Sequence, residues 1–419
     1  MNPTTTTQPC CPEFARISRR GLFSGALALA GATTVVGSAA ITASAAASTP
    51  ADSVLVVLSL RGAADGLSLV VPHADPVYYS ARPRIAVPAD RLLAKDGMFG
   101  LHPKLAPLLP LWESGQLAAV QATGLAAPNR SHFSAMEEVE DADPGSDVRT
   151  GWLNRLIGTD AGRSPLQGFN VSGGVVPTSL YGPEPVMSAG NVASVHIPGD
   201  DKWDLTKGRR SSLRRMWDGN STSLGTAMKS VFDALDDFAP VIDTPDHADA
   251  YPRSDLGRAL SEVARVIRGN VGVEVITVDQ GDWDMHSDLG TAERGWLYNN
   301  AADLAASIAA FFKDLGDQRS KVTLVTISEF GRRVVENASM GLDHGYGNVM
   351  FLAGAGVKGG KYYGTWPGLT DDGDSDLLVT TDYRSVLAEV VSTRFGASTA
   401  AVFPRFQPET VGAMTSLQT

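Results

Sequence analysis

Histidines and carboxylates gather in short polar loops, each of which directly follows an apolar run of the chain. Three of the seven histidines in 419 residues fall in these loops. The loops hold Asp65; Asn129, Arg130, Ser131 and His132; Asp282, Asp284 and His286; and Glu329, Arg332, Arg333, Asn337, Asp343 and His344. Carboxylates and imidazoles without thiols suit a divalent ion, with Zn²⁺, Mn²⁺, Mg²⁺ and Ca²⁺ as candidates. The pattern therefore predicts one shared metal site.

Each loop also has a simpler interpretation. Asp65 lies in "DGLS", where an aspartate is a common turn residue. Ser131 stands where a helix N-cap would be, and the stretch "DWDMH" can be a solvated loop. The arginines can pair with nearby acids such as Glu336. The prediction of a shared site depends on the combination of these loops more than on any single residue.

The elements that must position these loops are short apolar strands alternating with helices. Strands are predicted at 54–60, 117–122, 273–279 and 322–327, and helices at 103–115, 220–238, 253–268 and 291–315. This alternation predicts an α/β fold with a doubly wound, mainly parallel sheet and helices on both faces. Ligands of such sheets lie beyond the carboxyl ends of the strands, so the polar loops should converge there. A loop-rich, β-containing insertion is expected at about 143–219.

Composition and charge narrow the classes of partner. The chain is 43% hydrophobic and 19% charged, which is typical of a globular protein. Its formal net charge is −11, and the first 45 residues are net positive, so the remainder is more acidic still. Nucleic acid is an unsuitable partner for such a surface, because phosphate backbones attract clustered lysine and arginine.

The N-terminal 45 residues resemble a twin-arginine export signal. Arg19 and Arg20 precede an apolar run rich in Gly and Ala, and small residues at 43–45 suit a signal peptidase. A transmembrane anchor is the alternative, but the run from Leu22 to Ala40 is poor in leucine. We expect recognition by the twin-arginine export machinery, no stable membrane span after cleavage, and a periplasmic or extracellular mature protein. Cleavage would remove both cysteines, Cys10 and Cys11, and leave residues 46–419 as a single domain.

Six stretches of the sequence together resemble one bacterial protein family. They are "LRGAADGLSLVVPHADPVYYSARPRIAV", "NRSHFSAME", "GWLNR", "WDMH", "SEFGRRVVEN" and "DHGYGNVMFLAGAGVKGG". The chain is similar in these stretches to domain-of-unknown-function family 1501, whose members typically carry twin-arginine signals. That family is grouped with the alkaline phosphatase and sulfatase superfamily. The resemblance implies an alkaline-phosphatase-like fold with metal ions beyond the sheet.

The resemblance also implies a role for each site residue. Metal ligands would come from Asp65, Asp282 or Asp284, His286, Glu329, Asp343 and His344. Ser131, which opens a helix, resembles the nucleophile. The chemistry itself, apart from the resemblance, suggests that Arg130, Arg332 or Arg333 would hold the anionic group and that His132 would protonate the leaving group. Phe330 stands where the superfamily usually has a histidine, so a second metal would lack one ligand.

The expected function is an exported metal-dependent hydrolase of small phosphate or sulfate esters. The alternative is a secreted, non-catalytic binding or scaffold protein on the same fold with a degraded metal site. The missing histidine after Glu329 favours the alternative, and the clustering of Ser131, His286 and His344 with the acids favours the enzyme.

Overall fold

The apolar run Val54–Leu60 forms strand β3 in the middle of an 11-stranded sheet. The structure is a computed structural model, and it describes residues 33–36, 39–42, 49–160, 164–172, 176–197 and 208–415. Strands β9 (Val275–Gln280) and β10 (Val322–Ile327) pair with β3 on either side, and both pairs are parallel. Nearly every residue of the three strands is buried, as expected for apolar strands covered on both faces.

The sheet is mainly parallel but mixed. Beyond β9 the parallel pairing continues to β7 (Gly168–Asn170) and β8 (Met187–Ser188). On the other side β11 (Asn348–Gly354) is antiparallel to both β10 and β6 (Leu117–Gly124). Because of this reversal, the amino end of β11 lies at the same edge as the carboxyl ends of β3, β6, β9 and β10. That edge carries the candidate site.

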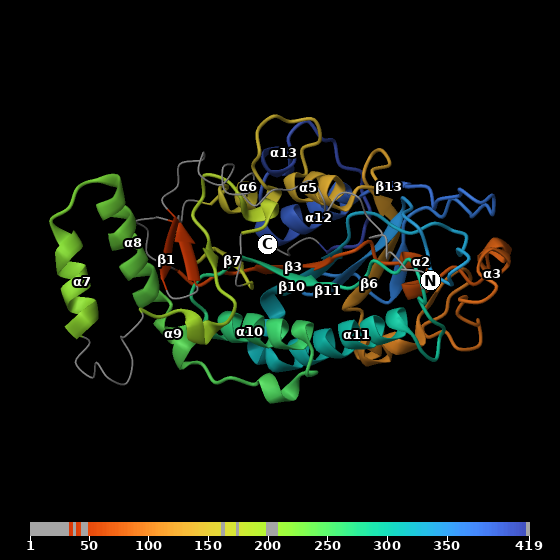
Figure 1. Ribbon diagram of the computed structural model, residues 1–419, viewed down its shortest axis with the longest axis horizontal. Coiled ribbons are helices and arrows are strands. Elements are labelled where there is room, and N and C mark those ends of the chain that lie inside the picture. Colours follow the sequence, from red (N-terminus) through yellow and green to blue (C-terminus); the bar gives the residue numbers. More distant parts are fainter. Residues whose placement is uncertain are drawn as a thin grey trace, which may run out of the picture.

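Helices cover both faces of the sheet, as the sequence predicted (Figure 1). One layer contains α10 (Asp255–Gly269), α11 (Trp296–Asp314), the 3₁₀ helix η2 (Pro103–Leu108) and α4 (Leu109–Glu113). The opposite layer contains α5 (His132–Asp141), α6 (Trp152–Ile157), α12 (Tyr383–Phe395) and α13 (Thr399–Val402). Separate buried apolar clusters accompany the two faces, so the sheet is closed to solvent on both sides.

Shorter elements complete the described chain. They are α2 (Gly66–Leu69), β4 (Val70–Val71), α3 (Pro76–Ala81), β5 (Gly100–Leu101), η3 (Thr178–Leu180), η4 (Val192–Ser194), α9 (Ala239–Asp243), η5 (Ala248–Ala250), η6 (Gly316–Lys321), β12 (Lys361–Tyr363) and β13 (Thr381–Asp382). A hairpin of α7 (Gly208–Asp218) and α8 (Ser223–Asp237) projects from one end of the molecule (Figure 1). No helix in the described ranges combines the length and apolar character that a membrane crossing requires.

Several expected boundaries differ from those observed. The helix predicted at 103–115 divides into η2 and α4, because Pro107 and Pro110 cannot donate backbone hydrogen bonds. The helix predicted from 291 begins at Trp296, after a loop in which Gly295 has a φ of +117°. The predicted insertion contributes β7 and β8 to the main sheet.

Two strands fall inside the predicted signal segment. They are β1 (Thr33–Val36) and β2 (Ala39–Thr42), which form an antiparallel pair at the edge of the sheet. Residues Ala40 and Ile41 of β2 pair with β8. The rest of the predicted signal, including Arg19 and Arg20, lies outside the described residues.

Candidate metal centre

Four separate loops meet at the edge of the sheet where β3, β6, β9 and β10 end, and three of them carry the cluster residues. The loop after β6 leads into α5 and brings His132, and the loop after β9 brings Asp284 and His286. The connection between β10 and β11 brings Glu329 at its start and His344 near its end. These residues lie up to 212 positions apart, so the sheet brings them together.

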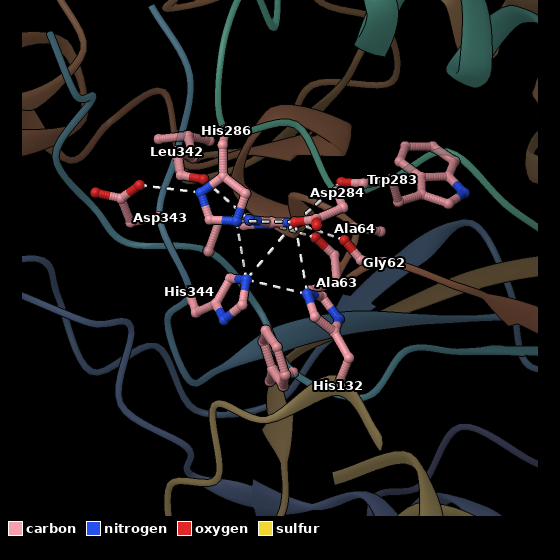
Figure 2. A network of polar contacts seen from close by, with 12 residues as sticks. Gly62, Ala63, Ala64, His132, Trp283, Asp284, His286, Leu342, Asp343 and His344 are labelled. Carbon is pink, nitrogen blue, oxygen red and sulfur yellow. Dashed lines mark hydrogen bonds and ion pairs between the residues drawn. The ribbon is translucent and has the colours of Figure 1, made fainter. Parts of the chain in front are cut away.

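Three imidazoles and one carboxylate point at a common centre (Figure 2). The Nε2 of His344 lies 3.0 Å from Nε2 of His132 and 2.9 Å from Nε2 of His286. Oδ1 of Asp284 lies 3.0 Å from Nε2 of His286, 3.5 Å from that of His132 and 3.6 Å from that of His344. His132, Asp284 and His344 offer ligand atoms that all lie within 4.8 Å of one another, and this triad could hold a metal ion.

The Nδ1 atom of each histidine is bound to a group that can only accept a hydrogen bond. Nδ1 of His132 lies 2.7 Å from Oε1 of Glu329, and Nδ1 of His286 lies 3.1 Å from Oδ1 of Asp343. Nδ1 of His344 lies 2.8 Å from the backbone carbonyl of Arg130. Each Nδ1 must therefore carry its proton, which leaves the lone pair of each neutral ring on Nε2. Metal-ligating histidines are oriented in this way.

This arrangement requires positive charge at its centre. Three Nε2 lone pairs and a carboxylate oxygen repel one another unless a cation or a proton lies between them. Burial lowers the pKa of His132, but hydrogen bonds with Asp284 and Glu329 outweigh it and raise that pKa to about 9. Asp284 also raises the pKa of His286. Protons can thus fill the centre, and a metal ion would compete with them.

The ligand set also fits a metal ion by chemistry and spacing. Four ligands around Zn²⁺, at bond lengths of about 2.0–2.1 Å, would stand roughly 3.3 Å apart in a tetrahedron. The contacts within the cluster run from 2.9 to 3.6 Å. Imidazole nitrogen with one carboxylate suits Zn²⁺, Mn²⁺ or Fe²⁺ better than Mg²⁺ or Ca²⁺, which prefer oxygen ligands.

Arg332 connects the loops that carry the cluster. Its side chain is 1% exposed, and Nη2 donates 2.7 Å to Oδ1 of Asp284. Its other hydrogen bonds go to the carbonyls of Ala63, Leu342, Gly62 and Trp283. One guanidinium therefore ties the loops after β3, β9 and β10 together. Burial raises the pKa of Asp284, but its hydrogen bonds with the histidines and Arg332 outweigh burial and hold that pKa far below its usual range.

Close backbone packing at Gly62 and the aromatic ring of Phe330 also surround the cluster. Gly62 has a φ of +106°, and a Cβ there would lie 2.6 Å from the backbone nitrogen of Asp284. Only glycine fits such an approach. The ring of Phe330 packs against His132 and His344, with centroid distances of 4.9 and 5.0 Å. At the position where the resemblance would place another histidine, the chain thus has an apolar support for two imidazoles.

Three of the predicted metal ligands have other partners, and a fourth is exposed. Glu329 is buried and accepts hydrogen bonds from His132, Ser328 and the backbone nitrogen of Gly62. Asp343 accepts from His286 and Asn337. Both carboxylates hold histidines in place instead of facing the centre. Asp65 is buried in a bidentate ion pair with Arg82, which satisfies both of its oxygens. The carboxylate of Asp282 is exposed and has no hydrogen bond or ion pair within the described chain.

The structure gives each predicted catalytic residue a definite set of contacts. His132 uses Nδ1 for Glu329 and directs Nε2 at the centre, so it is a candidate ligand and not a free proton donor. Arg332 is fully occupied by the loops, so it cannot clamp a substrate. The guanidinium of Arg130 pairs with Asp376. Ser131 is the N-cap residue of α5, yet its side chain makes no capping hydrogen bond.

One anchor of the cluster has no signal in the sequence, and one candidate ligand has only an indirect signal. The carbonyl of Arg130 holds His344, and a backbone group leaves no signature in residue types. His132 could have been assigned as a ligand, because it follows a strand as His286 and His344 adjoin theirs.

A comparison with curated protein sequences found no match. A family model described as "Protein of unknown function (DUF1501)" matches residues 52–389, a range that includes every residue of the cluster. Since that match spans far more than half of the chain, this protein belongs to the DUF1501 family.

Proposed function

We propose that this protein is a metal-dependent hydrolase of phosphate or sulfate esters. One observation carries the proposal: His132, His286, His344 and Asp284 direct their ligand atoms at one point, while separate acceptors fix the three imidazoles. The point is open to solvent, since the side chain of Asp284 is 41% exposed. A site with protein ligands and solvent access is typical of catalytic metal centres.

Ser131 is the candidate nucleophile. The carbonyl of Arg130 and the ring of His132, on either side of it, both contact the cluster, and the hydroxyl does not serve as a helix cap. A bound divalent ion would act as a Lewis acid on the ester and would favour loss of the serine proton. The serine oxygen would then bond to phosphorus or sulfur, the alcohol would leave with a proton from solvent, and water would hydrolyse the enzyme ester.

The non-catalytic alternative receives less support from this geometry. A degraded site would be expected to lose its outer groups as well as its ligands. Here Glu329, Asp343 and Arg332 still hold the ligand residues from behind. Such outer partners matter for metal affinity and activity.

Metal content and ester hydrolysis test the proposal together. Protein purified without chelator, or offered Zn²⁺, Mn²⁺, Fe²⁺, Mg²⁺ and Ca²⁺ in turn, should bind about one ion per chain. His286→Ala and His344→Ala should each remove most of the metal and the turnover of 4-nitrophenyl esters. His247→Ala is a matched control, because His247 also bonds a buried carboxylate, Asp314, at 2.6 Å but lies outside the cluster. If the wild-type protein binds none of these ions, the hydrolase proposal fails.

Export remains a separate proposal. The paired arginines Arg19 and Arg20 and the following apolar run support transport by the twin-arginine route to the periplasm or beyond. The double substitution Arg19→Lys with Arg20→Lys should leave the precursor in the cytoplasm. Fractionation that finds normal amounts of the processed variant outside the cytoplasm would contradict this.

A further inference from the structure

The charges next to the cluster nearly cancel once a divalent ion is present. Asp284, Glu329 and Asp343 contribute three negative charges, and all three contact the histidines. Arg332 contributes one positive charge through its contact with Asp284. A divalent ion adds two, and neutral imidazoles add none. The formal sum is zero, apart from the exposed carboxylate of Asp282 two residues before Asp284.

Within the described chain, the arginines nearest to the cluster residues in sequence, Arg130, Arg332 and Arg333, each already pair with an aspartate. The guanidinium of Arg332 donates its hydrogen bonds to Asp284 and to backbone carbonyls. Arg130 pairs with Asp376, and Arg333 lies 2.9 Å from Asp374 and 3.8 Å from Asp376. Asp376 therefore holds Arg130 away from an incoming anion, while Asp374 is the nearer partner of Arg333.

The amino end of helix α5 adds a small further positive charge at the cluster. The ten-residue helix α5 directs its amino end toward the cluster, since His132 is its first residue and His344 bonds the carbonyl of Arg130. A helix end acts like roughly half a positive charge. The centre therefore carries roughly half a positive charge, which attracts a monoanion but leaves most of the charge of a dianion uncompensated.

We infer, resting on the proposed function, that the ester taken by this centre carries a single negative charge on its tetrahedral group. Sulfate monoesters and phosphodiesters share this chemistry. A phosphate monoester has a second pKa near 6 and is a dianion at pH 8, where it would face uncompensated repulsion. The preference for monoanions arises because the nearby arginines are already paired with aspartates. Asp376 maintains this preference through its contacts with Arg130 and Arg333.

Binding of small matched anions tests the inference without turnover. Methyl sulfate and dimethyl phosphate are monoanions at pH 8, and methyl phosphate is a dianion of similar size. Calorimetric titration of the full chain loaded with Zn²⁺ should show both monoanions binding at least about tenfold more tightly than methyl phosphate. Equal or tighter binding of methyl phosphate, or binding of none of the three, would overturn the inference.

A pair of variants tests the cause. Asp376→Asn releases Arg130, so methyl phosphate should bind more tightly relative to dimethyl phosphate by several fold. Asp374→Asn removes the same charge from an aspartate that is 95% exposed. It leaves Arg130 paired with Asp376 and leaves Asp376 3.8 Å from Arg333, so the ratio should change little. An unchanged ratio in Asp376→Asn would overturn the assignment of the preference to the paired arginines.

Turnover separates this inference from the function on which it rests. Among 4-nitrophenyl sulfate, methyl 4-nitrophenyl phosphate and 4-nitrophenyl phosphate, one of the first two should have the highest kcat/KM, and the winner identifies the sulfate or phosphodiester class. Fastest hydrolysis of 4-nitrophenyl phosphate would overturn the inference but keep the hydrolase. Selective binding of monoanions without hydrolysis of any ester would reject the hydrolase instead.

Discussion

Glu329 supports the candidate metal centre without directing its carboxylate at the middle of the cluster. Its carboxylate is buried, and hydrogen bonds from His132 and from the backbone of Gly62 outweigh burial and lower its pKa. The charge of Glu329 makes His132 a better ligand, because it strengthens the Nδ1 hydrogen bond and increases the basicity of Nε2. The sequence suggested Glu329 as a metal ligand, but its carboxylate instead holds a candidate ligand, His132, by a hydrogen bond.

Substitution of Glu329 by glutamine should weaken metal binding without abolishing it. Glutamine keeps the size of the side chain and can still accept from His132, but it removes the negative charge. Loss of such a partner typically lowers metal affinity by about 10–100-fold. Competition with a chromophoric chelator measures this. Glu140→Gln is the control, since Glu140 is also buried but pairs with Arg61, and it should leave affinity unchanged. A Glu329→Gln variant with wild-type affinity would refute the orienting role.

Two serines at helix N-caps differ in the hydrogen bonds that their hydroxyls make. Ser254 caps α10 by accepting from the backbone nitrogen of Gly257 at 2.9 Å, and its hydroxyl also bonds Asp303. Ser131 occupies the same cap position on α5 and makes no such bond. The two serines thus have the same place in a helix and different use of the hydroxyl.

Substitution by alanine should mainly affect stability at Ser254 and mainly affect turnover at Ser131. Ser254→Ala should lower the free energy of unfolding by about 0.5–2 kcal/mol, because a helix cap is lost. Ser131→Ala should change stability less but abolish turnover of the ester substrate while metal content stays normal. Thermal denaturation, metal analysis and kinetics on both variants measure this. An active but less stable Ser131→Ala protein would show that Ser131 is only a cap.

Strands and the site edge were predictable from the sequence, and side-chain partners were not. The runs at 54–60 and 322–327 match β3 and β10, because continuous apolar β-branched residues identify buried parallel strands. The rule that ligands lie beyond strand ends located the loops of His286 and His344. Asp65 was misassigned because its partner Arg82 lies 17 positions away, with no pattern that marks the pair.

The whole molecule should respond to pH at a point remote from the cluster. Glu274 precedes β9 at the amino end of that strand, where its carboxylate bonds Gln167. Burial, with the negative charge of Asp160, raises the pKa of Glu274 from 4.5 to about 7. The folded state therefore holds this proton more tightly than the unfolded state. Its contribution to stability is complete below about pH 4.5 and is lost as pH rises through about 7.

Glu274→Gln should remove this dependence. Glutamine is neutral at every pH and can still accept from Gln167. We expect the variant to be more stable than the wild type by about 1–2 kcal/mol at pH 8, after allowance for partial exposure, and of similar stability near pH 4.5. Denaturant unfolding at both pH values measures the difference. A Glu293→Gln control changes an exposed glutamate and should show no such pH effect. A constant difference between the variant and wild type at both pH values would contradict the prediction.

Arg332 joins three loops of the fold to the cluster through its hydrogen bonds. Lysine keeps the charge but cannot reach Asp284 and the carbonyls of three loops at once. Arg332→Lys should lower the free energy of unfolding by about 2–4 kcal/mol and reduce metal content. The neighbouring Arg333→Lys should cost less than about 1 kcal/mol, because Arg333 pairs with the exposed Asp374. Equal effects of the two substitutions would show that Arg332 is not the connector.

The antiparallel direction of β11 gives the connection 328–347 both its ends at the same edge of the sheet. Its tip, Ala338–Met340, is exposed, while Asn337 just before it bonds the carbonyl of His286 and the carboxylate of Asp343. A protease that cut at this tip would divide the connection between Glu329 and His344 without altering either residue. A metal ion bound at the centre would hold the segment 341–347 in place through His344. The rate of proteolytic cleavage at 338–340 should therefore fall as metal is added, and this rate would report how much of the protein has metal bound.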